Sequence, residues 1–224
     1  MSTEPVLAEP LRDAAEHYFG ARLELARRYA ERLATDGVVR GLIGPREVPR
    51  LWERHLLNSV ALVEMLPDNA SVVDVGSGAG LPGVVLGIAR PDLDVVLVEP
   101  LLRRTTFLDE VVRELELSRV TVLRARAEDA VGELEPADAV VARAVAPLDR
   151  LARWCLPLAA PGGRVLAMKG ASAAEEVATH EQAVRRAGGG QAVVRTCGAE
   201  WLDPAVTVVE VVREQSGRVR HARF

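Results

Sequence analysis

The sequence predicts an α/β protein in which a mostly parallel sheet carries helices on both faces and follows an N-terminal helical extension. From residue 71 onward, short runs of consecutive apolar, β-branched residues alternate with helix-like segments, as in a sheet that is covered on both faces. Before residue 70 the apolar residues recur with helical spacing, and no strand-like run interrupts them. We expect a helical extension over 1–69, a sheet domain over 70–214 and a basic tail over 215–224, all in one compact unit.

The extension is predicted to contain two helices. Apolar residues at helical spacing mark the first of them, from about residue 5 to residue 34. The segment 35–45 is rich in turn residues, and we expect it to be the loop between the helices. The second helix is expected to begin between Pro45 and Pro49 and to end before Pro67.

Seven apolar runs predict the strands of the sheet. Five of them are each followed by a helix-like segment and are expected to pair in parallel. The last two are joined by a short link that contains proline and has no room for a crossover helix, so they predict an antiparallel pair at the sheet edge. The seven runs lie at 72–75, 95–98, 120–123, 139–141, 165–168, 191–196 and 205–212.

The composition is that of an ordinary globular protein. The chain has 224 residues, of which 49% are hydrophobic and 27% charged, and this excludes collagen-like and intrinsically disordered classes. No apolar run is long enough to span a membrane and the first residues do not resemble a secretion signal, so we expect a cytoplasmic protein without membrane contact. The spacing of Cys155 and Cys197 fits neither a metal site nor a disulfide framework, and both are expected in the core.

The net charge of −4 argues against a protein that coats nucleic acid by bulk electrostatics. All cationic side chains except Lys169 are arginines, however, and because arginine binds phosphate bidentately, this bias is compatible with a local RNA-binding surface. The same arginine bias, together with many alanines and valines, is also typical of a GC-rich genome.

A glycine-rich loop, Asp74 to Gly83, follows the first predicted strand and leads into a helix. Such a loop lets a ligand approach the backbone at the carboxyl edge of the sheet. The glycines alone fit either a dinucleotide or S-adenosylmethionine. Asp74 would repel a pyrophosphate but attract the cationic groups of S-adenosylmethionine, and Pro82 removes an amide donor that pyrophosphate binding uses. The loop therefore favours S-adenosylmethionine.

Further candidates follow the other parallel strands. Glu99 ends the second strand, where a carboxylate can accept hydrogen bonds from ribose hydroxyls, or can instead cap the next helix. Ala127 and Glu128 follow the third strand, on the side expected for adenine. Arg143 ends the fourth strand, where cofactor and substrate would meet, unless it forms a surface ion pair. Lys169 ends the fifth, either as a phosphate contact or as a snorkelling strand-end lysine.

Taken in order, five segments resemble one family, the bacterial 16S rRNA 7-methylguanosine methyltransferases, also called RsmG or glucose-inhibited division protein B. The resemblance implies a Rossmann-like class I methyltransferase fold and S-adenosyl-L-methionine as cofactor. The implied reaction is methylation of N7 of a guanine in the 530 loop of 16S rRNA, and the implied partner is the 30S subunit or its assembly intermediate. The segments are Arg54–Ser59, Asp74–Gly83, Val98–Pro100, Ala142–Leu148 and Met168–Gly170.

The resemblance and the strand-end arguments together define the candidate site. We expect Arg143 to position cofactor and substrate and Lys169 to contact RNA. No metal is expected, and the enzyme is expected to act as a monomer. The motif of the family assigns the cofactor to Gly76, Leu81, Ala127, Glu128 and Arg143, and the arguments from the loop and from the strand ends add Asp74, Gly78, Gly80 and Glu99.

The chemistry of guanine N7 fits the absence of an obvious catalytic dyad. N7 carries a free lone pair and no proton, so its methylation requires alignment of the reactants and no general base. Three alternatives remain: a nicotinamide-dependent dehydrogenase, an RNA-binding module without catalysis, and a methyltransferase for small molecules on the same fold.

Overall fold

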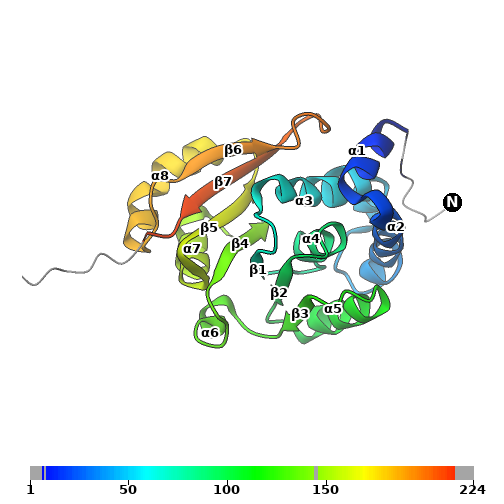
Figure 1. Ribbon diagram of the computed structural model, residues 1–224, viewed down its shortest axis with the longest axis horizontal. Coiled ribbons are helices and arrows are strands. Elements are labelled where there is room, and N and C mark those ends of the chain that lie inside the picture. The colour runs from blue at the N-terminus through cyan, green and yellow to red at the C-terminus, as the bar shows by residue number, and fades with distance from the viewer. Residues whose placement is uncertain (1–6, 8, 144–145, 215–224) are drawn as a thin grey trace, which may run out of the picture.

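The computed structural model describes residues 7, 9–143 and 146–214, and these contain a seven-stranded sheet (Figure 1). Its strand order is β3-β2-β1-β4-β5-β7-β6. Strands β1 to β5 pair in parallel, and β7 is antiparallel to both β5 and β6, as predicted. The strands are β1 Ser71–Val75, β2 Asp94–Val98, β3 Val120–Leu123, β4 Ala137–Arg143, β5 Ala159–Lys169, β6 Val193–Cys197 and β7 Val206–Val212.

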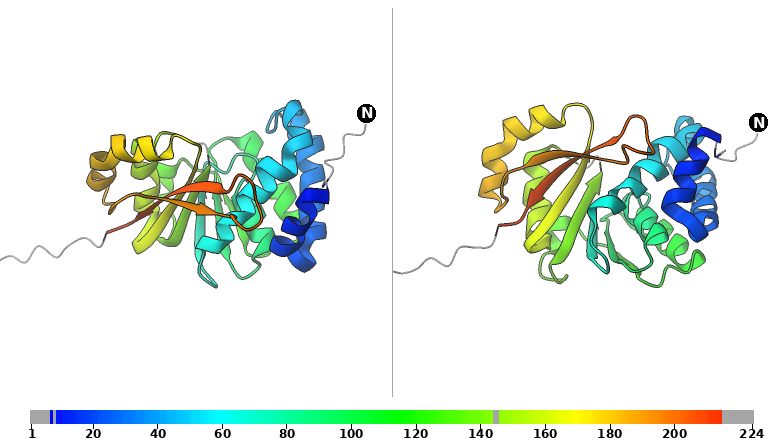
Figure 2. Two further views of the ribbon diagram at one scale, coloured as in Figure 1. Left: turned by 90° about the horizontal axis from the view of Figure 1, so that it is seen from above. Right: turned by 45° about the horizontal axis from the view of Figure 1, so that its top comes forward.

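Helices cover both faces of this sheet (Figure 2). Because side chains alternate along a strand, Val72 packs in the core on one face and Val73 in the core on the other. The first face is covered by the N-terminal extension together with α4 (Gly83–Ala89) and α5 (Leu102–Glu114). The second face is covered by α6 (Ala127–Ala130), α7 (Leu148–Cys155) with the short turn η6 (Leu156–Leu158), and α8 (Ala173–Arg186).

The extension contains two helical stretches, as predicted, but their boundaries differ from the expected ones. The first stretch bends at Gly20, whose φ is +48°. It then continues to residue 39 through a π-helical turn, so the connecting loop is shorter than the expected 35–45. The elements are α1 Glu9–Phe19, η1 Gly20–Arg22, α2 Leu23–Arg32, η2 Leu33–Gly37, η3 Pro45–Arg50, η4 Leu51–Leu57, α3 Asn58–Val60 and η5 Ala61–Met65.

Thr35 and Asp36, two of the residues that favoured a loop, find polar partners within the helical stretch. The Thr35 hydroxyl donates to the Glu31 carbonyl one turn earlier, and Asp36 forms ion pairs with Arg32 and Arg40 at 2.6 and 3.8 Å. Side chains that usually favour turns therefore support the helical backbone here, because each finds its partner one helical turn away.

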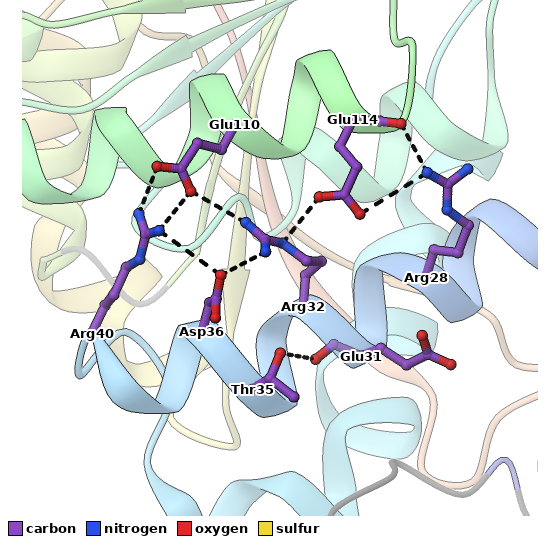
Figure 3. Close-up of polar contacts among 8 residues, drawn as sticks. All are labelled: Arg28, Glu31, Arg32, Thr35, Asp36, Arg40, Glu110 and Glu114. Carbon is purple, nitrogen blue, oxygen red and sulfur yellow. Dashed lines mark hydrogen bonds and ion pairs between the residues drawn. The ribbon is translucent and has the colours of Figure 1, made fainter.

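Ion pairs join the extension to α5 (Figure 3). Arg32 lies 3.2 Å from the carboxylates of both Glu110 and Glu114, and Arg40 lies 2.6 Å from Glu110. The guanidinium of Arg40 also lies over the ring of Phe107. Arg32 and Arg40 are thus paired across the contact, and they attach the extension to the helix that follows β2.

Other expectations concern composition and the chain ends. Cys155 and Cys197 are buried free thiols, as predicted, and burial raises the pKa of each to about 12. The part of the chain that the structure describes contains no cluster of ligands suited to a metal ion and no helix that could cross a membrane. The basic tail over 215–224 and two residues of the family motif, Ala144 and Val145, lie outside the described residues.

Candidate active site

The glycine loop connects β1 to α4 at the carboxyl edge of the sheet. Gly76, Gly78 and Gly80 have φ angles of +72°, +59° and +98°, in the region that residues with a side chain rarely adopt. A side chain on Gly80 would also collide with Val84 and with the hydroxyl of Tyr29. The three glycines are therefore required by the path of the backbone, and they leave the loop without side chains at these positions.

Asp74 is buried at the end of β1, behind this loop. Its Oδ2 accepts a hydrogen bond from the amide of Gly83 at 3.0 Å, and a Cβ on Gly83 would lie only 2.7 Å from that oxygen. Its Oδ1 is buried and has no hydrogen-bond partner among the described residues. Burial raises the pKa of Asp74 to about 7. A buried acceptor without a donor fits a ligand that brings a cationic N–H group.

Glu99 immediately follows β2 and is also buried. Its Oε2 accepts from the amide of Gly78 at 3.0 Å and from Arg104 at 3.2 Å, and its Oε1 accepts from the amide of Leu101 at 3.0 Å. The capping interpretation is thus correct, because Leu101 immediately precedes α5. A carboxylate oxygen can accept two hydrogen bonds, so Oε1 can still accept one from a ribose hydroxyl.

Tyr29 of α2 reaches the same loop from the extension. It is fully buried, and its hydroxyl donates to the carbonyl of Ala79 at 2.6 Å. Burial, followed by the nearby carboxylate of Asp74, raises its pKa well above the usual value. In the sequence, Tyr29 is one of the apolar positions at helical spacing in the extension, and the spacing alone assigns it no other role. The available signal was its hydroxyl, because a buried tyrosine needs a hydrogen-bond partner.

Arg143 ends β4 and binds the second helical stretch of the extension. Its Nη2 donates to the Arg54 carbonyl at 3.0 Å and to Nδ1 of His55 at 2.8 Å. Its Nη1 lies 3.3 Å from the Ser59 hydroxyl and 3.4 Å from the His55 carbonyl. Four of the five N–H groups of the guanidinium are thereby used, and none of these bonds goes to a carboxylate. Arg143 therefore holds the extension against the strand end, and among the residues that the structure describes it has no carboxylate partner of the kind that the alternative required.

His55 connects Arg143 to Glu47. An arginine can only donate, so Nδ1 of His55 must be the acceptor, and Nε2–H then donates to Glu47 at 2.9 Å. Burial, followed by the charge of Arg143, lowers the pKa of His55. The hydrogen bond from His55 lowers the pKa of Glu47. The three side chains form a chain of hydrogen bonds with a neutral imidazole at its centre.

Lys169 ends β5 in a similar internal arrangement. Its Nζ lies 2.7 Å from Oε2 of Glu176 and donates to the carbonyl of Ala146 at 2.9 Å. Glu176 also accepts from the amide of Leu148 at 3.2 Å, at the start of α7. The side chain of Lys169 is only 9% exposed. Its charge is therefore paired within the protein, and together with Glu176 it binds the backbone of Ala146 and Leu148 at the start of α7.

A cleft of about 1280 Å³ opens beside these strand ends. Its walls come from η3 and η4, the start of α7, and the loop between β6 and β7, and both Arg143 and Lys169 line it. The glycine loop, Asp74 and Glu99 are not among its lining residues. The candidate site thus has two adjoining parts: the glycine loop with Asp74 and Glu99, and the cleft. Of the residues predicted to bind the cofactor, Arg143 lines the cleft.

The remaining predicted residues lie at the same edge of the sheet. Leu81 is partly buried against the core below the loop. Ala127 and Glu128 begin α6 shortly after β3, with Ala127 buried and Glu128 exposed. Asp74 contacts the loop through the amide of Gly83. Glu99 contacts it through the amide of Gly78. Ala127 and Glu128 lie at the carboxyl edge of the sheet, but within the described residues neither forms a polar contact with the glycine loop.

Fold and site together define a class of protein. A sheet with the order β3-β2-β1-β4-β5-β7-β6 and an antiparallel β7, a glycine loop after β1 and an acidic residue at the end of β2 are the features of class I methyltransferases. A solved structure of a precorrin-6y C5,15-methyltransferase from Geobacter metallireducens shares this fold, with a TM-score of 0.51 and 16% identity over 76% of this chain and 90% of that one.

Comparison with known sequences identifies the family within this class. The family model described as rRNA small subunit methyltransferase G matches residues 22–204, and the chain belongs to this family. A protein of Salinispora arenicola named ribosomal RNA small subunit methyltransferase G is 61% identical, covering 94% of this chain and 91% of that protein. A protein of the same name from Corynebacterium efficiens is 52% identical, covering 96% and 92%. The resemblance noted from the motifs is thereby confirmed, and the chain is an S-adenosyl-L-methionine-dependent methyltransferase of ribosomal RNA.

Proposed function

We propose that this enzyme methylates N7 of a guanine in the 530 loop of 16S rRNA. Family membership carries the proposal and favours ribosomal RNA over the small-molecule alternative. The hydrogen bonds of two ionisable groups, His55 of η4 and Lys169 at the end of β5, support N7 as the acceptor. His55 and Lys169 are bound to Glu47 and Glu176 and are not available as a general base. Guanine N7 needs no base, because its lone pair can attack directly.

The residues at the carboxyl edge fit S-adenosylmethionine. When bound, the cofactor supplies a methyl group on a cationic sulfur. In our proposal Oδ1 of Asp74 accepts from its ammonium group and Glu99 accepts from its ribose, while Gly76, Gly78 and Gly80 let it approach the backbone. We assign Leu81, Ala127 and Glu128 to the adenosine, and Arg143 to the boundary between cofactor and substrate.

The protein contributes alignment and exclusion of water in this proposal. With the cofactor bound, N7 would take the methyl group and the electron pair of the bond to the methyl carbon would stay on sulfur, so the residues of the site need only align the two reactants. No proton moves, since N7 carries none. Arg143 is fixed by four hydrogen bonds and can hold the acceptor in line at low entropic cost.

The proposed partner is the 30S subunit or an assembly intermediate, and the proposed compartment is therefore the cytoplasm. An RNA loop suits an enzyme that must reach a base edge, because an unpaired base can be extruded from its stack. We further propose that the enzyme acts as a monomer, which light scattering after size exclusion would test.

Transfer of labelled methyl groups to 30S subunits that lack the 530-loop modification tests the proposed reaction. Chemical cleavage at 7-methylguanosine then locates the product, and label at a guanine of that loop is expected. Asp74→Ala and Glu99→Ala should bind S-adenosylmethionine more weakly in calorimetry. Transfer to another site, or to no form of the subunit, would overturn the proposed substrate, and unchanged affinity in both variants would overturn the proposed cofactor contacts.

A further inference from the structure

We propose that the cleft beside Arg143 is an RNA site, in which Arg50, Arg54 and Arg150 bind phosphates on either side of the target nucleotide and Trp201 stacks on a neighbouring base. The inference rests on the proposed function, since it takes RNA as the substrate. It assigns RNA contacts to side chains other than the two that sequence reasoning selected, Arg143 and Lys169.

The two selected cations already have internal partners. Lys169 is paired with Glu176 at 2.7 Å, and the guanidinium of Arg143 binds two carbonyls, a hydroxyl and an imidazole of the extension. Binding a phosphate through either side chain would break hydrogen bonds that hold the site together. Within the described residues these contacts use four of the five N–H groups of Arg143, so one is left to position the target base but no pair is left for a bidentate phosphate contact.

Three other arginines of the cleft have accessible donors. Arg50 and Arg54 are 48% and 49% exposed, and their ion pairs with Glu53 and Glu47 are long, at 3.5 and 3.8 Å. Such exposed pairs contribute little free energy, so a phosphate can compete for these guanidinium groups. Arg150 is exposed on α7 and forms no ion pair within the part of the chain that the structure describes.

These arginines lie on different elements that line the cleft. Arg50 ends η3 and Arg54 lies in η4, both in the extension, whereas Arg150 lies in the first turn of α7. All three line the same cleft as Arg143. A guanidinium binds a phosphate through two parallel hydrogen bonds, so cations on facing walls can hold the backbone on both sides of one nucleotide.

Trp201 gives the cleft an aromatic surface. It lies in the loop between β6 and β7, lines the cleft and is 37% exposed. One face of its indole stacks on His17 of α1, with ring centroids 4.2 Å apart and planes inclined by 16°. The loop is held further by the amide of Gly198, which donates to Glu64 at 2.9 Å. A fixed, partly exposed indole is a suitable platform for a nucleobase.

The size of the cleft favours single-stranded RNA. Its volume of about 1280 Å³ exceeds the roughly 300–1,000 Å³ that is usual for small-molecule sites. It therefore has room for a nucleotide and for parts of its neighbours. Arginines around an aromatic side chain are the usual arrangement for binding unpaired strands, in which every base presents a face for stacking.

The experiment compares Arg50→Gln/Arg150→Gln with the wild type and with Arg185→Gln, which removes an exposed arginine of α8 outside the cleft. For the double variant we expect the KM for 30S subunits to rise about tenfold, with kcat and the affinity for S-adenosylmethionine unchanged. The dependence of RNA affinity on salt should also become shallower, because fewer phosphates are neutralised. Trp201→Ala should raise the same KM, and Trp201→Phe should restore it.

Binding of a fluorescent single-stranded RNA oligonucleotide, followed by anisotropy, is the second readout and does not require methylation. If the wild type methylates 30S subunits and the cleft variants match Arg185→Gln in both assays, the inference is wrong while the proposed function stands. If the wild type transfers no methyl group but the cleft variants bind RNA more weakly, the cleft assignment stands while the proposed reaction fails. Equal weakening by Arg185→Gln would indicate a general charge effect and overturn the inference.

Discussion

The buried carboxylates at the carboxyl edge differ in how many of their oxygens have a hydrogen-bond partner. Both oxygens of Glu99 have partners, whereas Oδ1 of Asp74 has none within the described structure. Both carboxylates are predictable from sequence, because each ends a recognisable strand. The contacts around them are less predictable: Tyr29 reaches the carbonyl of Ala79 from the extension, and Glu176 pairs with Lys169 across the turn before α8, and no local pattern encodes these contacts.

The unsatisfied oxygen of Asp74 predicts a conflict between stability and binding. In the unfolded chain an aspartate has a pKa of about 3.9, and in the folded protein that of Asp74 is raised to about 7. The folded state therefore binds more protons between these values, and this group makes stability fall as pH rises from about 4 to about 7. In Asp74→Asn we expect a higher Tm than in the wild type at pH 8 and a weaker affinity for S-adenosylmethionine.

Calorimetry on the wild type at pH 6 and pH 8 should show tighter cofactor binding at the higher pH, because the carboxylate is then charged. Asp74→Asn should show little such pH dependence. A variant that is both less stable and equally tight in binding would contradict this account of the orphaned oxygen.

His55 predicts a pH dependence of the opposite sign. Its pKa is lowered in the folded protein, so the unfolded chain takes up a proton first as the pH falls below about 6.5. The contribution of His55 to stability is present above that pH and is lost below it. In His55→Asn the loss of unfolding free energy between pH 7.5 and pH 5.5 should be smaller than in the wild type. Urea unfolding at both pH values checks this, and an equal loss would show that His55 is not the titrating group.

At the scale of elements, the sheet follows the sequence pattern closely and the extension does so only in outline. Strands buried on both faces are uninterrupted apolar runs, so their positions can be recognised locally. The helical path through Thr35 and Asp36 depends instead on ion pairs with Arg32 and Arg40, and through these arginines on Glu110 of α5. Sequence alone does not show that α5 supplies this partner about seventy residues away.

The network around Glu110 predicts a measurable contribution to stability. Glu110→Gln should lower the free energy of unfolding by about 1 kcal/mol, because two arginines lose a shared carboxylate at the contact between the extension and α5. Glu181→Gln is the matched control. It breaks a single exposed pair with Arg185 on α8 and should cost less, about 0.3–0.5 kcal/mol.

Denaturant unfolding of both Gln variants with urea at low salt, and again at about 1 M NaCl, measures the difference. High salt should reduce the effect of Glu110→Gln. Equal effects of the two substitutions at low salt would mean that the network contributes no more than an isolated surface pair.

At the scale of the whole molecule, the sheet separates two cores. Trp52 of η4 packs with the core under the extension, and Trp154 of α7 packs with the core on the opposite face. The compact unit expected from the sequence predicts that both cores unfold together, since every strand contributes to the interior between the helical layers. The motifs alone could not place the extension, because its contacts with α4 and α5 involve pairs that are distant in sequence.

Variants that retain a single tryptophan, either Trp52 or Trp154, can report on the two cores separately. In each variant we expect the urea midpoint from fluorescence to equal the midpoint from far-UV circular dichroism of that same variant. An earlier transition for Trp52 would show that the extension is an independently unfolding domain.

The stacking of Trp201 on His17 brings together the two ends of the described chain. One wall of the cleft comes from residues 50–58, and another comes from residues 201–207, which lie between and at the start of the last two strands. During synthesis the first wall leaves the ribosome long before the second. A nascent chain therefore has its glycine loop well before it has a complete cleft, and it can bind RNA there only after residues 201–207 have been synthesised.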